Sequence, residues 1–179
     1  MKVKVLSLLA VFTLFLSSCK DKEATKEGNG GNPFFSVDMQ VTTKKTDNFC
    51  MYFSEDGTTN FKDNNAIWKG VNGGKEKEIV SFALTDEKIP THIRLDFGLK
   101  QDQDSVVVKN IKVDYYGNSY EFKGSDFFNY FIKDEQFLTK TDVAKGTLTI
   151  LAKEGVYKTP YYYPTQLTID KIREITTKK

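Results

Sequence analysis

Several residue types and patterns that would point to a particular chemistry are scarce or missing in this chain. His92 is the single histidine among 179 residues, which excludes a zinc or iron site with several histidine ligands. No G-x-S-x-G segment, which carries the nucleophilic serine of α/β-hydrolases, occurs in the sequence. No apolar run reaches the roughly twenty residues that a helix needs to cross a bilayer. Together with a mean hydropathy of -0.45, this argues against a polytopic membrane protein.

The chain also lacks a net charge once its first 18 residues are set aside. It has 26 basic and 24 acidic side chains, and Lys2 and Lys4 are the only charged residues among the first 18, so 24 of each sign remain. Phosphate binding needs an excess of lysine and arginine on one surface, so this balance argues against nucleic acid as a partner. The remaining length suits one domain and is short for two.

The first 19 residues have the pattern of a bacterial export signal. Lys2 and Lys4 give a positive start, an apolar run follows over 5–16, and Leu16-Ser17-Ser18-Cys19 ends the segment. This end resembles the lipobox of bacterial lipoproteins, in which small residues precede a cysteine that receives lipid. The resemblance implies that 1–18 are a signal peptide and that Cys19 is lipidated. Two or more acyl chains hold a protein durably on a membrane, and the family carries three.

Residues 20–32 contain no large apolar side chain, so the sequence predicts a flexible tether over 19–32 and a single domain over 33–179. The charged start of this tether, Lys20-Asp21-Lys22-Glu23, resembles the export signals of surface-exposed lipoproteins in Bacteroidetes-type bacteria. We therefore expect an outer-membrane lipoprotein of the cell envelope, either surface-exposed or facing the periplasm. With Cys19 lipidated, Cys50 has no partner for an internal disulfide, and its apolar surroundings predict a buried, unreactive thiol.

The domain is dominated by short segments in which apolar and polar residues alternate, as in half-buried strands. The segment 105–116 keeps this alternation only with a register slip or a bulge. The stretch 115–120 predicts a hairpin corner, because Gly117-Asn118 tolerates positive φ. The predicted strands cover 35–42, 49–53, 66–71, 79–84, 92–97, 105–116, 120–122, 147–152 and 166–169.

One segment, 125–132, predicts a short helix. Ser125 can cap its start, and its aromatic residues are too apolar for an exposed helix, so it should pack as a plug on the sheets. The closing segment, 168–179, is ambiguous, since isoleucines three residues apart suit a helix while the β-branched content favours a strand. Eight or nine short strands with one short helix predict an all-β fold, an antiparallel β-sandwich, with an up-and-down barrel as the alternative.

Four segments together resemble the jelly-roll domains called galactose-binding-like, which include many carbohydrate-binding modules. The resemblance implies a jelly-roll β-sandwich, and it supports this fold more than it supports a carbohydrate ligand. The segments are Phe49-Cys50-Met51-Tyr52-Phe53, Ile79-Val80-Ser81-Phe82-Ala83-Leu84, Ile93-Arg94-Leu95-Asp96-Phe97-Gly98 and VVVKNIKV over 106–113. The chain departs from the family in having no recognisable calcium loop near the start of the domain.

Aromatic residues supply the candidate ligand-binding side chains. Sugar rings stack on Trp and Tyr, and 24 of the 179 residues are aromatic. The run Tyr161-Tyr162-Tyr163 and the single tryptophan, Trp68, are the predicted binding residues. In an extended segment Tyr161 and Tyr163 share one face and Tyr162 takes the other. The alternative is that these rings complete the core or the edge of a small sandwich.

Metal binding and catalysis have weaker support. The stretches 54–57 and 101–104 offer oxygen atoms but do not match a twelve-residue calcium loop, so they are interpreted as solvated turns, and neither a metal nor a cofactor is expected. A serine-histidine-aspartate set would have to use His92, which a structural role explains better. Because Asp and Glu are plentiful, the sequence leaves open a pair of carboxylates that hydrolyses glycosidic bonds.

The sequence thus predicts a lipid-anchored, non-catalytic binding module outside the cytoplasm, with a glycan at the outer membrane as the concrete ligand. A structural or protein-interaction lipoprotein of the envelope is the alternative, and a small hydrolase is the third hypothesis.

Overall fold

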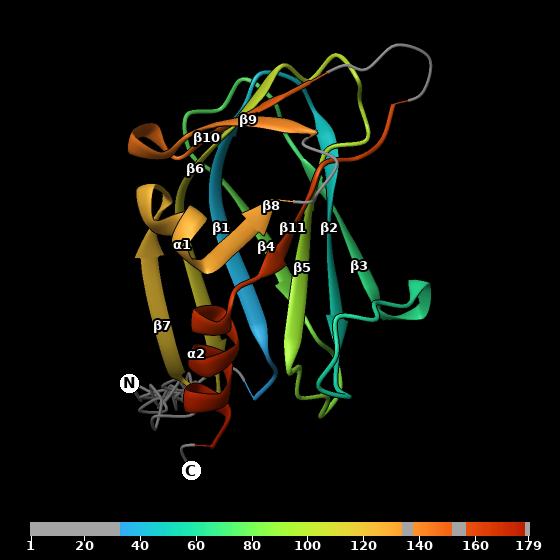
Figure 1. Cartoon of the computed structure of the whole chain (residues 1–179), viewed down its shortest axis with the longest axis vertical. Helices are drawn as coiled ribbons and strands as arrows, with labels where there is room; N and C mark the ends of the chain where they lie inside the picture. Colours follow the sequence, from blue (N-terminus) through green and yellow to red (C-terminus); the bar gives the residue numbers. More distant parts are fainter. Residues whose placement is uncertain (1–32, 134–137, 152–156, 178–179) are drawn as a thin grey trace, which may run out of the picture.

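The computed structural model describes residues 33–133, 138–151 and 157–177. They form two antiparallel sheets packed face to face, with two α-helices against them (Figure 1). The predicted antiparallel β-sandwich is confirmed, and the barrel alternative is wrong. The predicted signal peptide, the lipidated Cys19 and the tether lie outside the described residues and stay predictions.

Eleven strands make up the two sheets in the described residues. Sheet A has the order β4-β1-β6-β10-β9, with β7 also paired to β6, and sheet B has the order β3-β2-β5-β11-β8. The strands of sheet A are β1 Ser36–Thr43, β4 Glu78–Ala83, β6 Ser105–Tyr115, β7 Asn118–Lys123, β9 Thr139–Asp142 and β10 Thr147–Ile150. The strands of sheet B are β2 Asp47–Ser54, β3 Ala66–Val71, β5 His92–Phe97, β8 Phe131–Lys133 and β11 Tyr161–Pro164.

The chain passes repeatedly from one sheet to the other. It runs from β1 in sheet A to β2 and β3 in sheet B, returns to β4, and crosses again to β5 and back to β6. Such wrapping connections are those of a jelly roll, in which two sheets are wound together along the chain. Several neighbouring strands of one sheet, such as β1 and β6 or β5 and β11, are therefore far apart in sequence, and residues distant along the chain meet on one face.

The core lies between the sheets and is rich in aromatic rings. Phe97 makes edge contacts with Phe49, Phe127 and Tyr162, with ring centroids 5.2, 5.8 and 5.7 Å apart. Phe35 and Phe82 are also fully buried. Burying one such side chain contributes about 1.5–3 kcal/mol, so the inward half of each alternating strand stabilises the sandwich.

The irregularity predicted in 105–116 is present. Gln40 of β1 pairs with Asn110 of β6, while the next residue, Val41, pairs with Val108, so Lys109 is the extra residue of a bulge. The bulge restores the inward direction of Val106 and Val108, which both pack in the core.

The predicted hairpin corner joins β6 to β7, but its turn lies one residue earlier than expected. The residues with positive φ are Tyr116, at 51°, and Gly117, at 77°. This pair of left-handed residues gives the twist that a two-residue hairpin needs. Tyr116 is 51% exposed at the tip.

The predicted helix at 125–132 is shorter than expected. A 3-10 turn, η2 Gly124–Asp126, leads into α1 Phe127–Tyr130, and the chain then extends into β8. Ser125 does not cap α1, whose N-cap is Asp126 without a side-chain cap hydrogen bond. Phe127 and Phe131 are buried as the plug interpretation requires, whereas Ile132 is exposed.

The end of the chain corrects the sequence prediction. The segment predicted as a strand at 166–169 and the described part of the ambiguous tail form one helix, α2 Gln166–Thr177. Ile172 and Ile175 are buried, and Thr168 donates to the carbonyl oxygen of Tyr130. Charged pairs three residues apart, Lys171 with Glu174 among them, support its exposed side. Spacing on one helical face therefore outweighed the β-branched content.

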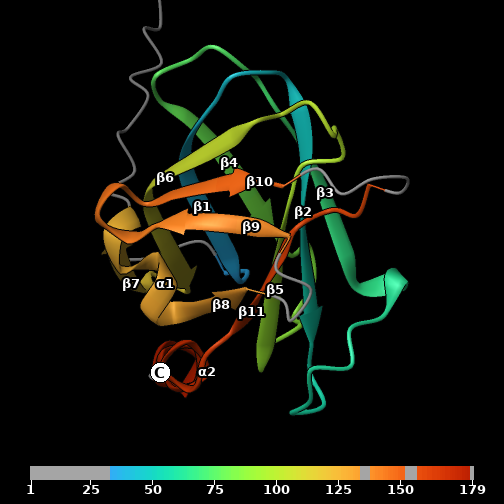
Figure 2. The ribbon, with the colours of Figure 1, turned by 45° about the horizontal axis from the view of Figure 1, so that its top comes forward.

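Helix α2 closes one open side of the sandwich. It contacts β6 and β7 of sheet A as well as β5 and β11 of sheet B. Figure 2 shows α2 nearly end-on, below β8 and β11 in that view. In the part of the chain that the structure describes, neither helix has the length and apolar character needed to cross a membrane. The other face of sheet B, directed away from the core, is not covered by α2.

Candidate functional site

The outer face of sheet B carries a group of aromatic residues around one ion pair. Register places Trp68 of β3 and Asp96 of β5 opposite Cys50 of β2, and Tyr161 of β11 opposite Asp96. Directly opposed residues of antiparallel strands point to the same side of a sheet. We call this surface the aromatic face; its residues are Tyr52, Phe61, Trp68, Arg94, Asp96, Tyr161 and Tyr163.

Three of the four predicted ligand-binding residues lie on this face, namely Trp68, Tyr161 and Tyr163. Trp68 is 46% exposed, and the two tyrosines are half-buried. Tyr161 and Tyr163 share one side of β11, as the extended conformation predicts.

Tyr162 is a correction to the predicted ligand set. It pairs with Leu95 of β5, which points into the core, and its exposed fraction is 0%. Its hydroxyl group forms a 2.6 Å hydrogen bond with Thr139 of β9. The alternation that puts its two neighbours outside puts Tyr162 inside, so it stabilises the fold and cannot reach a ligand.

The strand β5 shows how the sequence builds the two faces at once. Ile93, Leu95 and Phe97 fill the core, while Arg94 and Asp96 alternate with them and point outward. The Nε atom of Arg94 donates to one carboxylate oxygen of Asp96 and its Nη2 atom to the other, each at 2.8 Å. This two-point ion pair fixes the position of the guanidinium group beside Asp96.

Aromatic rings surround the Arg94 guanidinium group. Its Cζ atom lies 4.2 Å from the ring centre of Tyr52, 4.8 Å from that of Tyr161 and 5.6 Å from that of Phe61. Burial works to lower the pKa of Arg94, but the hydrogen bonds and charge of Asp96 outweigh it and raise this pKa above its ordinary value. The group is therefore a permanent cation held rigidly among rings.

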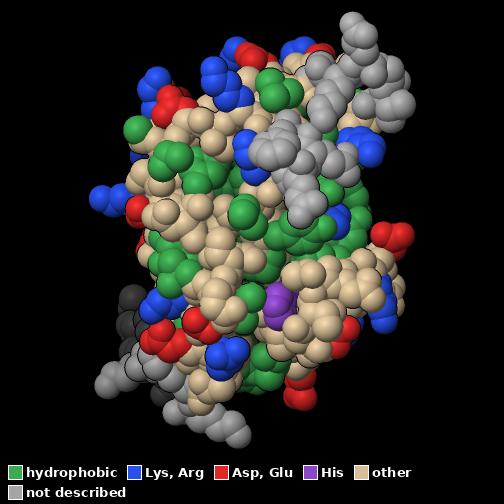
Figure 3. All heavy atoms as spheres, viewed as in Figure 1, with side chains coloured by type: hydrophobic (Ala, Val, Ile, Leu, Met, Phe, Trp, Pro, Cys, Tyr) green, Lys and Arg blue, Asp and Glu red, His purple; other side chains and the backbone are tan. Residues whose placement is uncertain are grey.

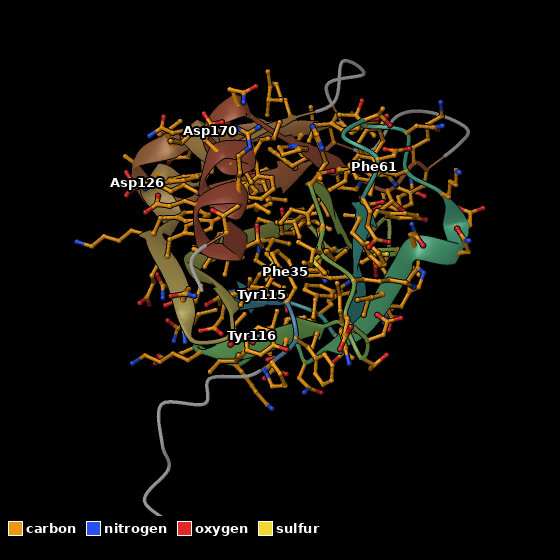
Figure 4. The ribbon with its side chains drawn as sticks, turned by 90° about the horizontal axis from the view of Figure 1, so that it is seen from below. Phe35, Phe61, Tyr115, Tyr116, Asp126 and Asp170 are labelled. Atoms are coloured by element: carbon orange, nitrogen blue, oxygen red, sulfur yellow. The ribbon has the colours of Figure 1, made fainter. Side chains whose placement is uncertain are left out.

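Further ring contacts join the loop that follows β2 to β11. Phe61 stacks on Tyr163 with ring centres 6.0 Å apart, and Tyr163 makes an edge contact with Tyr161 at 5.4 Å. Figure 4 shows Phe61 on the side of the molecule away from the Tyr115 and Tyr116 hairpin. The aromatic face thus combines residues from four strands and one loop on one surface.

Cys50 lies at the base of this face. Its exposed fraction is 0%, which confirms the predicted buried thiol. Burial, and secondarily the charge of Asp96, raises the pKa of Cys50 to about 12. The thiol is therefore protonated at neutral pH and unreactive as a nucleophile. Burial also raises the pKa of Tyr52 beside it.

The predicted weak candidates for catalysis and metal binding have other partners. The Nδ1 atom of His92 lies 3.1 Å from the hydroxyl oxygen of Thr91, and the hydroxyl of Ser54, which pairs with His92 across the strands, donates to the Thr58 carbonyl. Among the described residues no hydrogen bond joins His92 to a carboxylate, and no three metal-ligating side chains converge.

The 101–104 turn is only partly the solvated turn that the sequence predicted. Asp102 and Asp104 form exposed ion pairs with Lys45 and Lys44. Gln103 in contrast is fully buried, and its amide nitrogen donates to Asp47 at 3.1 Å. This turn therefore anchors the start of β2.

Other hollows in the described surface differ in chemistry from the aromatic face. A polar hollow of about 470 Å³ lies on sheet A, lined by Gln40, Thr42, Glu76, Lys77 and Lys109. A smaller one of about 160 Å³ lies between α2 and the Ile89-Pro90-Thr91 turn. On the side seen in Figure 3, charged side chains lie mostly around the rim, with hydrophobic and uncharged atoms over the middle.

Comparison of the chain with protein-family models, with curated proteins and with solved structures gave no match. The function is therefore argued from the aromatic face itself.

Four residues of the aromatic face were missed by the sequence prediction, namely Tyr52, Phe61, Arg94 and Asp96. For three of them a signal exists, because Tyr52, Arg94 and Asp96 occupy the outward positions of strands whose inward positions are apolar. Phe61 lies in a loop, and its position depends on contacts with β11 that no local pattern reveals.

Proposed function

We propose that this protein is a lipid-anchored, non-catalytic glycan-binding protein of the bacterial outer membrane. The observation that carries the proposal is the aromatic face, in which Trp68, Tyr161 and Tyr163 lie on the same outer sheet surface as the Arg94–Asp96 pair.

The chemistry of this face suits a sugar. Aromatic rings supply apolar surface for the C–H side of a pyranose ring. The guanidinium group supplies donors for hydroxyl oxygens, since Arg94 uses Nε and Nη2 on Asp96, and in the described residues Nη1 makes no hydrogen bond. Rings that are already packed on one another lose little conformational entropy when a ligand binds.

The location rests on the lipobox resemblance at Cys19. A lipid anchor would hold the sandwich at the membrane surface, where envelope or environmental glycans are reached. Mass spectrometry of the protein purified from its membrane should find a chain that begins at an acylated Cys19. A chain that begins at Met1 with a free Cys19 thiol contradicts this part of the proposal.

Ligand binding is tested with a glycan array followed by calorimetric titration of the full-length protein. Trp68→Ala and Tyr163→Ala should each weaken binding of a long oligosaccharide by about tenfold, equal to about 1.4 kcal/mol. The matched control is Tyr116→Asn, which removes an exposed ring from the opposite side of the molecule at a positive φ that asparagine tolerates. Absence of binding across the array, or equal losses in the control, would falsify the proposal.

A protein-interaction role in the envelope is the second candidate, and one observation favours it. Strand β4 ends the order of sheet A in the described residues, and Ile79 on it is 65% exposed. An edge strand with an exposed apolar side chain can pair with a strand of another protein. Cross-linking in whole cells should then give a defined adduct that Ile79→Lys abolishes; an adduct that persists in this variant excludes the β4 edge as the contact.

A further inference from the structure

The aromatic face contains one row of side chains that crosses four strands. Trp68, Cys50, Asp96 and Tyr161 are successive register partners on β3, β2, β5 and β11. Neighbouring strands lie about 4.8 Å apart, so three spacings separate the backbone of Trp68 from that of Tyr161 by about 14 Å. The row therefore has an aromatic residue at each end and runs perpendicular to the strands.

The two middle residues of this row are buried, whereas its ends carry aromatic rings with exposed surface. Cys50 has no exposed surface and Asp96 is 6% exposed, while Trp68 is 46% exposed and Tyr161 half-buried. A single pyranose ring is no wider than one aromatic side chain and cannot contact both ends. A chain of linked sugar rings presents apolar faces at intervals along its length, with hydroxyl groups between them.

The charge in the middle of the row is balanced. Arg94 and Asp96 neutralise each other through two hydrogen bonds of 2.8 Å, and the side chain of Asp96 is nearly buried. A carboxylate or sulfate on the ligand would gain attraction from Arg94 and repulsion from Asp96 at similar distances. The pair can still exchange hydrogen bonds with neutral hydroxyl groups.

We infer that the ligand is an uncharged, unbranched oligosaccharide that lies across strands β3, β2, β5 and β11, with one sugar ring on Trp68 and another on Tyr161 beside the Arg94–Asp96 pair. This inference rests on the proposed glycan-binding function and adds the class and direction of the ligand. The Tyr161 end holds more contacts than the Trp68 end, because Arg94, Tyr52 and Tyr163 surround it. A short sugar therefore binds at the Tyr161 end.

The test is calorimetric titration of the full-length protein with cellobiose and cellohexaose, mannobiose and mannohexaose, and maltose and maltohexaose. For the sugar that binds, the hexasaccharide should bind about tenfold more tightly than the disaccharide. Trp68→Ala should remove this gain and leave the disaccharide affinity within about twofold of that of the unmodified protein. Tyr161→Ala should weaken both, and Tyr116→Asn should weaken neither.

The outcomes separate this inference from the function on which it rests. Equal affinity for disaccharide and hexasaccharide, or an equal loss for both in Trp68→Ala, overturns the extended ligand while glycan binding stands. Tighter binding of hexagalacturonic acid than of every neutral hexasaccharide overturns the uncharged ligand. Absence of binding to any neutral or acidic sugar contradicts the proposed function itself. Circular dichroism of each variant checks that the sandwich is folded before its affinity is compared.

Discussion

The outer faces of the two sheets have the same backbone geometry and different chemistry. On the outer face of sheet A, one row of register partners across four strands contains only polar side chains. On the outer face of sheet B, a row across four strands has an aromatic side chain at each end. The sheet A row is Ser81–Asp38–Lys112–Glu121, and the sheet B row is Trp68–Cys50–Asp96–Tyr161. Both sheets bury apolar residues on their inner faces.

This difference separates the side chains that a β-sandwich requires from those on sheet B that its packing does not require. A sandwich requires apolar inner faces and outer faces that water can solvate, and the opposite charges of Asp38, Lys112 and Glu121 meet the second requirement on sheet A. Sheet B exposes aromatic surface and fixes a guanidinium group there, although neither is required for packing the two sheets. We therefore place the proposed function on sheet B.

The largest expected effect separates the inner from the outer face of a single strand. Tyr162→Ala should lower the free energy of unfolding by about 3–5 kcal/mol, because it empties a fully buried site packed against Phe97 and Phe127. Tyr163→Ala should lower it by no more than about 1 kcal/mol. Urea unfolding of both variants checks this, and equal losses would mean that β11 has no distinct inner side.

A smaller effect compares the ion pairs of the two sheets. Arg94→Ala should cost about 2 kcal/mol, because it removes two charge-assisted hydrogen bonds from the nearly buried Asp96 carboxylate. Lys112→Ala should cost about 0.5 kcal/mol or less, since the Lys112–Asp114 pair is solvated on the lysine side. The double change Arg94→Ala with Asp96→Ala should recover part of the first loss in the same unfolding experiment. If Arg94→Ala and Lys112→Ala are equally stable, the Arg94–Asp96 pair stabilises the fold no more than the solvated pair on sheet A does.

The smallest effect concerns pH and the histidine at the start of β5. Burial lowers the pKa of His92 below its ordinary value of 6.5, and the charge of Asp56 offsets this only in part. The unfolded chain therefore binds the proton more tightly than the folded protein does. Above pH 6.5 His92 is neutral in both states and does not lower the free energy of unfolding. As the pH falls below 6.5, its protonation in the unfolded chain lowers that free energy.

His92→Gln removes that contribution. The difference in unfolding free energy between the variant and the unmodified protein should be constant above pH 6.5 and should shift in favour of the variant below it. Parallel pH curves for the two proteins would show that burial does not perturb His92.

Much of the fold follows from the alternation of apolar and polar residues. This alternation located β1, β2, β5 and β6, and it required the bulge that Lys109 supplies. The strand predicted at 166–169 was wrong and the closing segment was left ambiguous, because β-branched residues favour strands locally. The buried side of α2 is instead defined by contacts with β5, β6, β7 and β11. Packing outside the segment decided its structure, and that information is not local in sequence.

The candidate site was predictable only in part. Tyr161, Tyr163 and Trp68 are visible as rings in or beside strands, and strand geometry alone assigns Tyr162 to the opposite face from its neighbours. The row of register partners exists only because of the strand order of sheet B, β3-β2-β5-β11. This order brings together residues up to 111 positions apart along the chain, from Cys50 to Tyr161. Short-range patterns do not determine that order.

The most direct test of the central claim uses the single tryptophan of the chain as its own reporter. Because Trp68 lies on the aromatic face, its fluorescence reports on that surface alone. Titration of the full-length protein with neutral hexasaccharides should give a saturable change in Trp68 emission, and Tyr161→Ala should weaken that response. A hexasaccharide that binds by calorimetry but leaves Trp68 emission unchanged would contradict the assignment of the ligand site to sheet B.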